Sequence, residues 1–277
     1  MAGFVGVLKD SLRIFLENPL LVVPKLVVAF LYSFAIVFVV KFMVDFFTST
    51  DIAFRPIAAS DYAALALALF VLVVDLAALV LDTIVNLMLP LLVVQLRDRK
   101  ALDFRAAFRA VSSDLWKSFV PIGLVLAVFA ALTSAWALVY VLLFGYVPDA
   151  GEPEILFLFG PWLLIALAVA FMFYMLFPVS AIERLPVGGS LRRAFTLSVS
   201  NWRGVSKALA VSVFLSGLSF AIALALNFIS EEHSLVFWAA FIIVRFLTAY
   251  IATYMYVLSP VFYLDCVKGA KASGAMA

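Results

Sequence analysis

The chain has 277 residues, of which 67% are hydrophobic and 13% are charged, and its formal net charge is +2. Soluble domains are about 45–50% apolar and about 25% charged, so this composition excludes an ordinary water-soluble protein and favours one that lies in the bilayer. With one cysteine and one histidine, the chain lacks the residues for a disulfide framework or a zinc site, and we expect no cofactor.

Six apolar runs are long enough to cross a hydrocarbon core of ~30 Å as helices. They lie at 19–45, 63–96, 118–145, 155–182, 205–229 and 235–264. Because backbone polar groups must pair with one another inside lipid, each run is predicted to be a helix. The sequence therefore predicts an all-α polytopic membrane protein with six transmembrane helices, forming a single membrane domain over residues 1–277.

The basic residues are distributed unevenly between the two ends of these spans. Sixteen of the 19, Lys25 among them, fall on the side of the two termini and of the loops after the second and fourth spans. Lys41 and Arg55 fall on the other side, and Arg245 lies within a span. The positive-inside rule then predicts cytoplasmic termini in a cell (plasma) membrane. Because the basic residues follow this topology, we expect no nucleic-acid binding.

One phrase ends every second span: an apolar run meets a proline, and five residues later comes a hydrogen-bond acceptor. The pairs are Pro90 and Gln95, Pro178 and Glu183, and Pro260 and Asp265. A short amphipathic stretch precedes each odd span. The chain therefore contains a predicted internal repeat of three units, at approximately 4–97, 101–185 and 188–268. A pseudo-threefold arrangement or an irregular bundle would both accommodate three such hairpins.

The three amphipathic stretches can be aligned with apolar or small residues at helical spacing. The aligned sets are Leu8, Ser11, Leu12, Phe15 and Pro19; Phe104, Ala107, Phe108, Val111 and Leu115; and Leu191, Ala194, Phe195, Ser198 and Trp202. A basic amphipathic helix of this kind is expected to lie in the inner membrane interface. It would either recognise a lipid or a partner, or serve as a connector at the surface.

The proline phrases allow two interpretations. A proline kinks a helix and frees a carbonyl that a neighbouring helix must satisfy. The polar residue that follows can reach the next amphipathic helix, and Glu183 has Arg192 or Arg193 as possible ion partners. The bent helix ends would then form either a gate lining an inner vestibule or simply the end of each span.

Three ionisable residues stand out inside the predicted spans: Asp75, Asp82 and Arg245. Asp75 and Arg245 each lie 15 residues before the proline of their own unit. Equal depth on matching faces predicts an ion pair between them, because an intramembrane charge needs a partner or a cavity. Asp82 and Asn86 fall on the same face of the second predicted span as Asp75, and they form a candidate polar interior. Asp82 has no charged equivalent, so we expect it to be protonated, to line a wet cavity, or to bond to a serine or threonine of a neighbouring helix.

The second unit carries a family resemblance. FPVSAIERLPVGG leads into SLRRAFTLSVSNW, and the residues concerned are Pro178, Glu183, Gly189, Ala194, Phe195, Ser198 and Trp202. This pattern resembles the six-helix membrane domain of glycerophosphoryl diester phosphodiesterases and a broad set of related prokaryotic integral membrane proteins. The resemblance implies a membrane bundle. It does not imply phosphodiesterase activity, which lies in a separate soluble domain of that family.

No nucleophile–base arrangement, phosphate loop or metal cluster is visible in the sequence, so we do not expect an enzyme; a membrane lipid enzyme is the alternative. The first functional hypothesis is a non-enzymatic transport-like or lipid-associated protein, with membrane lipids as partners and Asp82 in a polar interior. The second is a scaffold or accessory subunit that binds another membrane protein. A water-accessible cavity reaching Asp82 would favour the first, and a sealed bundle would favour the second.

Overall fold

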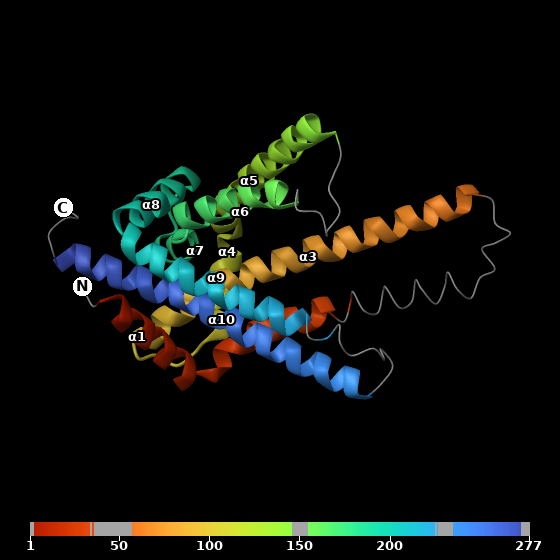
Figure 1. Cartoon of the computed structure of the whole chain (residues 1–277). Coiled ribbons are helices and arrows are strands. Elements are labelled where there is room, and N and C mark those ends of the chain that lie inside the picture. The colour runs from red at the N-terminus through yellow and green to blue at the C-terminus, as the bar shows by residue number, and fades with distance from the viewer. Residues whose placement is uncertain are drawn as a thin grey trace. The chain divides into compact units, whose positions relative to one another are not determined.

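The computed structural model describes residues 3–33, 35, 57–145, 155–224, 226 and 235–272, and all the regular elements among them are helical. In chain order they are α1 (Phe4–Glu17), η1 (Pro19–Val22), α3 (Ile57–Arg97), α4 (Phe104–Ser113), α5 (Leu115–Phe144), α6 (Ile155–Met172), α7 (Leu176–Pro178), η3 (Val179–Glu183), α8 (Val187–Ser200), α9 (Trp202–Leu224) and α10 (Leu235–Ala272) (Figure 1). The helical segment that starts with η1 continues to residue 33.

Within the described ranges, five helices are long and apolar enough to cross a membrane: Leu72–Arg97 within α3, all of α5, Phe159–Glu183, all of α9, and Val236–Lys268 within α10. The number rises to six if α1 and the segment Pro19–Ser33 together form one span. The first predicted span, 19–45, is described only as far as residue 35, and its remainder lies outside the described residues. The fold is thus an all-α polytopic membrane protein, as the apolar runs predicted.

The chain divides into two compact units. Unit 1 contains Met1–Glu17, Leu87–Leu215 and Tyr254–Ala277, and unit 2 contains Asn18–Asn86 and Ser216–Thr253. The three proline phrases and the three amphipathic stretches therefore belong to unit 1, except for Pro19 at the end of the first stretch. The polar side chains predicted inside the membrane all belong to unit 2.

The proline phrases form part of the core of unit 1. All three prolines are buried. The residues three positions before them are 0% exposed, namely Leu87, Met175 and Val257. Burial at matching positions agrees with the three predicted units, which stay a prediction. The ends of these three spans pack through apolar side chains on either side of a proline.

Pro178 illustrates how a proline is accommodated inside an apolar helix. Proline has no N–H, so the carbonyl of Tyr174, four residues earlier, loses its usual helical donor. The hydroxyl of Ser259 on α10 donates to that carbonyl at 3.0 Å. Beyond Pro178 the chain forms the wide turn η3 and leaves it at Arg184, whose φ of 49° is left-handed. A side chain from another helix thus replaces the missing backbone hydrogen bond.

The amphipathic stretches are α1, α4 and α8, and each is buried on one face. The buried residues are Val7, Ser11 and Phe15 in α1, Ala107 and Val111 in α4, and Ser190, Ala194, Leu197 and Ser198 in α8. Basic side chains at Lys9, Arg105 and Arg192 are exposed. Within unit 1, α1 packs on α10 through the rings of Phe15 and Tyr254, whose centroids lie 5.6 Å apart.

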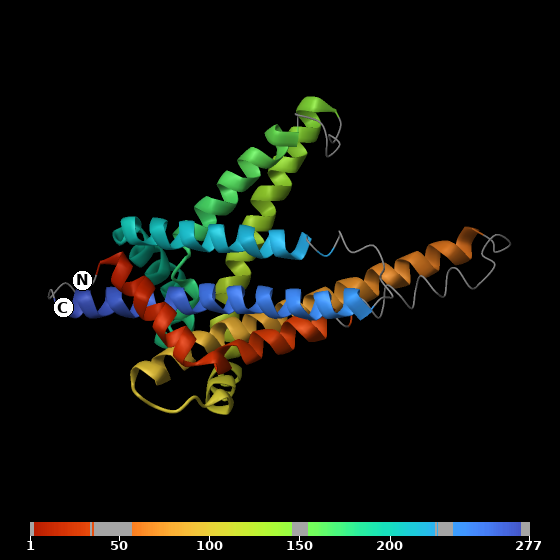
Figure 2. The same cartoon turned by 60° about the horizontal axis from the view of Figure 1, so that its bottom comes forward.

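A helical hairpin of α5 and α6 also belongs to unit 1, and the two helices lie side by side in both views (Figures 1 and 2). The rings of Phe129 and Trp162 meet across it at 6.2 Å. Leu138, Leu142 and Leu143 are exposed near the end of α5. Most of the hairpin's apolar surface therefore faces outward, as a membrane span requires.

Candidate functional site: a charged cavity in unit 2

Unit 2 contains a cavity of about 460 Å³ that we call the charged cavity. Four stretches of helix contribute to it: the segment after η1, α3, α9 and α10. Its lining residues are Lys25, Val28, Ala29, Tyr32, Asp75, Ala78, Leu79, Asp82, Ser219, Arg245, Thr248, Ala249 and Ala252. Two cations and two carboxylates therefore line a single cavity between helices that are long and apolar enough to span a membrane.

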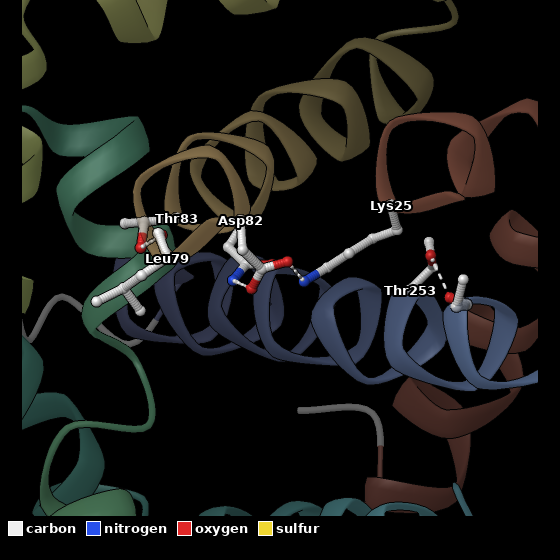
Figure 3. Close-up of polar contacts among 7 residues, drawn as sticks. Lys25, Leu79, Asp82, Thr83 and Thr253 are labelled. Carbon is white, nitrogen blue, oxygen red and sulfur yellow. Dashed lines mark hydrogen bonds and ion pairs between the residues drawn. The ribbon is translucent and has the colours of Figure 1, made fainter. Parts of the chain in front are cut away.

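The first pair of charges is joined directly. Lys25 Nζ lies 2.6 Å from Asp82 Oδ1, and Asn86 Nδ2 donates to Asp82 Oδ2 at 2.9 Å. Figure 3 shows the Lys25 and Asp82 side chains pointing toward one another from their separate helices. The Lys25 side chain is only 7% exposed, whereas that of Asp82 is 39% exposed. Both oxygens of the Asp82 carboxylate thus have a donor.

This pair corrects two predictions. Lys25 was expected among the basic residues of the inner surface, but it is buried in unit 2. Asp82 was expected to be unpaired, but it has a lysine and an amide as partners, in addition to lining the cavity. The serine or threonine partner considered as an alternative does not occur among the described residues. Thr83 and Thr253, the two threonines drawn in Figure 3, donate to carbonyls of their own helices.

Sequence reasoning missed Lys25 because it lies near the start of an apolar run, where snorkelling to the surface is common. A signal was nevertheless present. Lys25 is flanked by Leu21, Val22, Leu26 and Val27, so its position is as apolar as those of Asp75 and Asp82. Its partner is 57 residues away in the chain, beyond the reach of any local pattern.

The second pair of charges shares the cavity without direct contact. The hydroxyl of Tyr32 donates to Asp75 Oδ1 at 2.9 Å. Asp75 and Arg245 are both described, and no ion pair within 4.0 Å joins them. The predicted direct pair is therefore wrong in this structure, although the two residues do line one cavity. The physical reason is that Tyr32, from a helix outside the alignment that led to the prediction, supplies the donor to Asp75.

Arg245 is held by its surroundings rather than by a carboxylate. Its guanidinium carbon lies 5.1 Å from the centroid of the Phe241 ring, within the range of a cation–π interaction. Its Nε is buried and has no hydrogen-bond partner in the described part of the chain. The hydroxyl of Thr248 donates to the backbone carbonyl of Arg245, so this hydrogen bond does not involve the guanidinium. The cavity thus contains one cation with unused donor capacity.

The polar residues of the proline phrases are elsewhere, in unit 1. Gln95 accepts from the Asp103 backbone N–H at 2.9 Å and donates to the Asp103 carbonyl at 3.4 Å. Asp103 in turn caps α4 through the N–H of Ala106. Gln95 therefore holds the start of the next amphipathic helix, which is the role considered for these residues.

Glu183 joins three elements of unit 1. Its Oε1 is 3.3 Å from Arg193 Nε, and the hydroxyl of Tyr263 donates to the same oxygen at 2.5 Å. Of the two arginines considered as partners, Arg193 forms the ion pair. The carboxylate thus ties η3 to α8 and to α10. The second and third phrases are brought together here, as they are through Ser259 and the Tyr174 carbonyl.

Asp265 lines a separate cavity of about 460 Å³ in unit 1. Its neighbours there include Phe4 of α1, Asn201, Arg203 and Lys207 near the start of α9. The beginning of α1 therefore lies beside the third phrase. Whether the three bent ends act as a gate stays a prediction.

Across the described ranges no group of three or more His, Cys, Asp or Glu side chains is placed to hold a metal ion. Comparisons with models of protein families, with curated proteins and with solved structures each found no match to this chain.

Proposed function

We propose that this chain is a non-enzymatic membrane protein with a transport-like or lipid-associated role, and that its ligand binds in the charged cavity. The observation that carries the proposal is the presence of Lys25, Asp75, Asp82 and Arg245 around one cavity. The cavity volume of about 460 Å³ lies within the range of roughly 300–1,000 Å³ found for small-molecule sites.

The energetics of charge among membrane-spanning helices favour a ligand role over a purely structural one. An ionised side chain at mid-membrane costs about 2.5–3.5 kcal/mol on insertion scales. Pairing offsets this cost for Lys25 and Asp82, whereas Asp75 and Arg245 stay apart. Apolar residues of similar volume would hold the helices together nearly as well. Charges that contribute little to packing are best explained by a polar group that enters the cavity.

Native mass spectrometry of the protein gently extracted from its own membrane tests this proposal. We expect a single chain that carries a reproducible lipid or small molecule. The double variant Asp75→Leu/Arg245→Met removes the two cavity charges that do not pair with each other, so the Lys25–Asp82 pair stays intact while the adduct is reduced at least tenfold. A matched control is Arg13→Met/Glu17→Leu, which removes an exposed ion pair of 2.8 Å on α1. Absence of any adduct, or an equal adduct in both double variants, would contradict the proposal.

A scaffold or accessory-subunit role is the second candidate, and the α5–α6 hairpin favours it. Only 6% of the most apolar stretch of α5 is buried against the rest of the chain. This helix therefore offers a long lateral surface to lipid or to another membrane protein. The same mass spectra distinguish the two functions. A stoichiometric protein partner, lost when Leu142→Ser/Leu143→Ser is introduced on the exposed face, would favour the scaffold.

We also propose the orientation and membrane indicated by the basic residues: cytoplasmic termini in a plasma membrane, with α1, α4 and α8 at the inner surface. The one-sided burial of these helices and the exposure of Lys9, Arg105 and Arg192 support this placement. The resemblance to the membrane domain of glycerophosphoryl diester phosphodiesterases is likewise a proposal, one of architecture and not of activity.

A further inference from the structure

We propose that the ligand of the charged cavity is a zwitterion, whose anionic group binds Arg245 and whose ammonium group binds Asp75. The inference rests on the proposed function and specifies its ligand class. Its basis is that two opposite charges line one cavity without pairing, so each retains the capacity to bind a group of the other sign.

The anion arm is the guanidinium of Arg245. Its carbon lies 5.1 Å from the centroid of the Phe241 ring, a cation–π contact that supplies no hydrogen-bond acceptor. The Nε–H is buried without an acceptor in the described chain. A buried donor left unsatisfied destabilises the protein, and an incoming phosphate or carboxylate would satisfy it. Arginine binds these groups with two parallel hydrogen bonds, so a single anionic group of the ligand suffices.

The cation arm is the carboxylate of Asp75. Among the described residues it accepts one hydrogen bond, from Tyr32, and a carboxylate has about four acceptor positions. The Tyr32 bond orients the carboxylate and leaves the other positions for a donor. An ammonium group offers three N–H donors and the opposite charge, which makes it the complementary partner.

The remaining pair of charges sets the preference for a ligand without net charge. Lys25 and Asp82 neutralise each other, and Asn86 satisfies the second Asp82 oxygen. With Asp75 and Arg245 included, the four charges of the cavity sum to zero. A zwitterion preserves this balance. A purely anionic ligand would place its excess charge beside Asp75, and at the reduced dielectric of a membrane protein that repulsion is weakly screened.

An ethanolamine phospholipid and a free amino acid both carry this combination of charges. The test therefore offers both sources to the delipidated full-length protein. Phosphatidylethanolamine and phosphatidylglycerol are compared as lipids, and glycine is added as the free zwitterion. Native mass spectrometry then counts the lipids retained per chain. We expect retention of phosphatidylethanolamine at least tenfold above phosphatidylglycerol. Displacement by millimolar glycine would identify a free zwitterion as the ligand, and no displacement would identify the lipid headgroup.

Variants assign the two arms. Asp75→Asn should remove the preference for phosphatidylethanolamine while retention of phosphatidylglycerol is unchanged. Arg245→Gln should reduce retention of both lipids at least tenfold. Asp98→Asn and Arg192→Gln make the same chemical changes at exposed positions and should have no effect. Tyr32→Phe removes only the hydroxyl that orients Asp75, so it tests the cation arm by a few-fold loss of preference even if Asp75→Asn does not fold.

The outcomes separate this inference from the function on which it rests. Equal retention of the two lipids, preference for phosphatidylglycerol, or an unchanged preference in Asp75→Asn would overturn the zwitterion and leave a ligand-binding role intact. Retention of neither lipid, together with no binding of glycine, would overturn both.

Discussion

Breaking the Lys25–Asp82 pair from one side should destabilise the protein far more than removing both charges. Lys25→Met leaves an uncompensated carboxylate, which in a buried site costs about 3–5 kcal/mol. Because the Asp82 side chain is 39% exposed and keeps its bond from Asn86, we reduce the expected loss to about 2–3 kcal/mol. Asp82→Leu should have a similar effect, because it removes both the carboxylate that lies 2.6 Å from the buried Lys25 ammonium and the acceptor of Asn86.

The double variant Lys25→Met/Asp82→Leu should lose only about 1–2 kcal/mol, mainly from the amide of Asn86 that is left without its acceptor. The coupling energy of this double-mutant cycle is then about 2 kcal/mol or more. The assay is reversible unfolding in mixed micelles titrated with dodecyl sulfate, followed by far-ultraviolet circular dichroism. Ordinary hydrogen bonds between membrane helices couple by about 0.6 kcal/mol on average, so a value at or below that level would refute a strong buried ion pair.

Two further predictions concern unit 1 and use the same unfolding assay. Ser259→Ala should lower the free energy of unfolding by about 1 kcal/mol, because it removes the donor to the Tyr174 carbonyl; no change would mean that this carbonyl is satisfied in another way. Gly204→Ala should lower it by about 1–3 kcal/mol, because the added carbon would overlap the ring of Phe262. Gly217→Ala is the matched control, since no described atom lies within 4 Å of its added carbon, and it should be neutral or stabilising by up to about 1 kcal/mol. Equal effects at the two glycines would contradict the contact with Phe262.

The positions of the spans followed from composition and length because lipid permits few backbone solutions. An apolar run predicted at 118–145 is α5 (Leu115–Phe144), and one at 235–264 is the span Val236–Lys268. The few residues of difference lie at span ends, where polar side chains adjoin the apolar run and helices continue past the bilayer. These ends are set by hydrogen bonds such as the Asp103 cap of α4, which depend on neighbours in space.

The candidate site was only partly predictable. Equal spacing before two prolines placed Asp75 and Arg245 together, and both line the charged cavity. The spacing carried no information about Tyr32, whose hydroxyl contacts Asp75 and replaces the expected direct pair. Lys25 was assigned to the membrane surface for the same reason: a pattern along the chain reports depth and face, but not which helix lies opposite.

The sequence by itself determined that this is an all-α membrane protein, that its prolines recur at the ends of spans, and which charges are unusual for their surroundings. Those properties depend on composition and local spacing, because the bilayer favours apolar surface and requires backbone polar groups to pair within the protein. Only the tertiary structure decided that Lys25 neutralises Asp82, that Ser259 satisfies the carbonyl freed by Pro178, and that Asp75 and Arg245 share a cavity without pairing. The reason is that a side-chain contact within about 3 Å depends on the packing of helices far apart in the chain, and many packings are compatible with the same pattern of apolar residues.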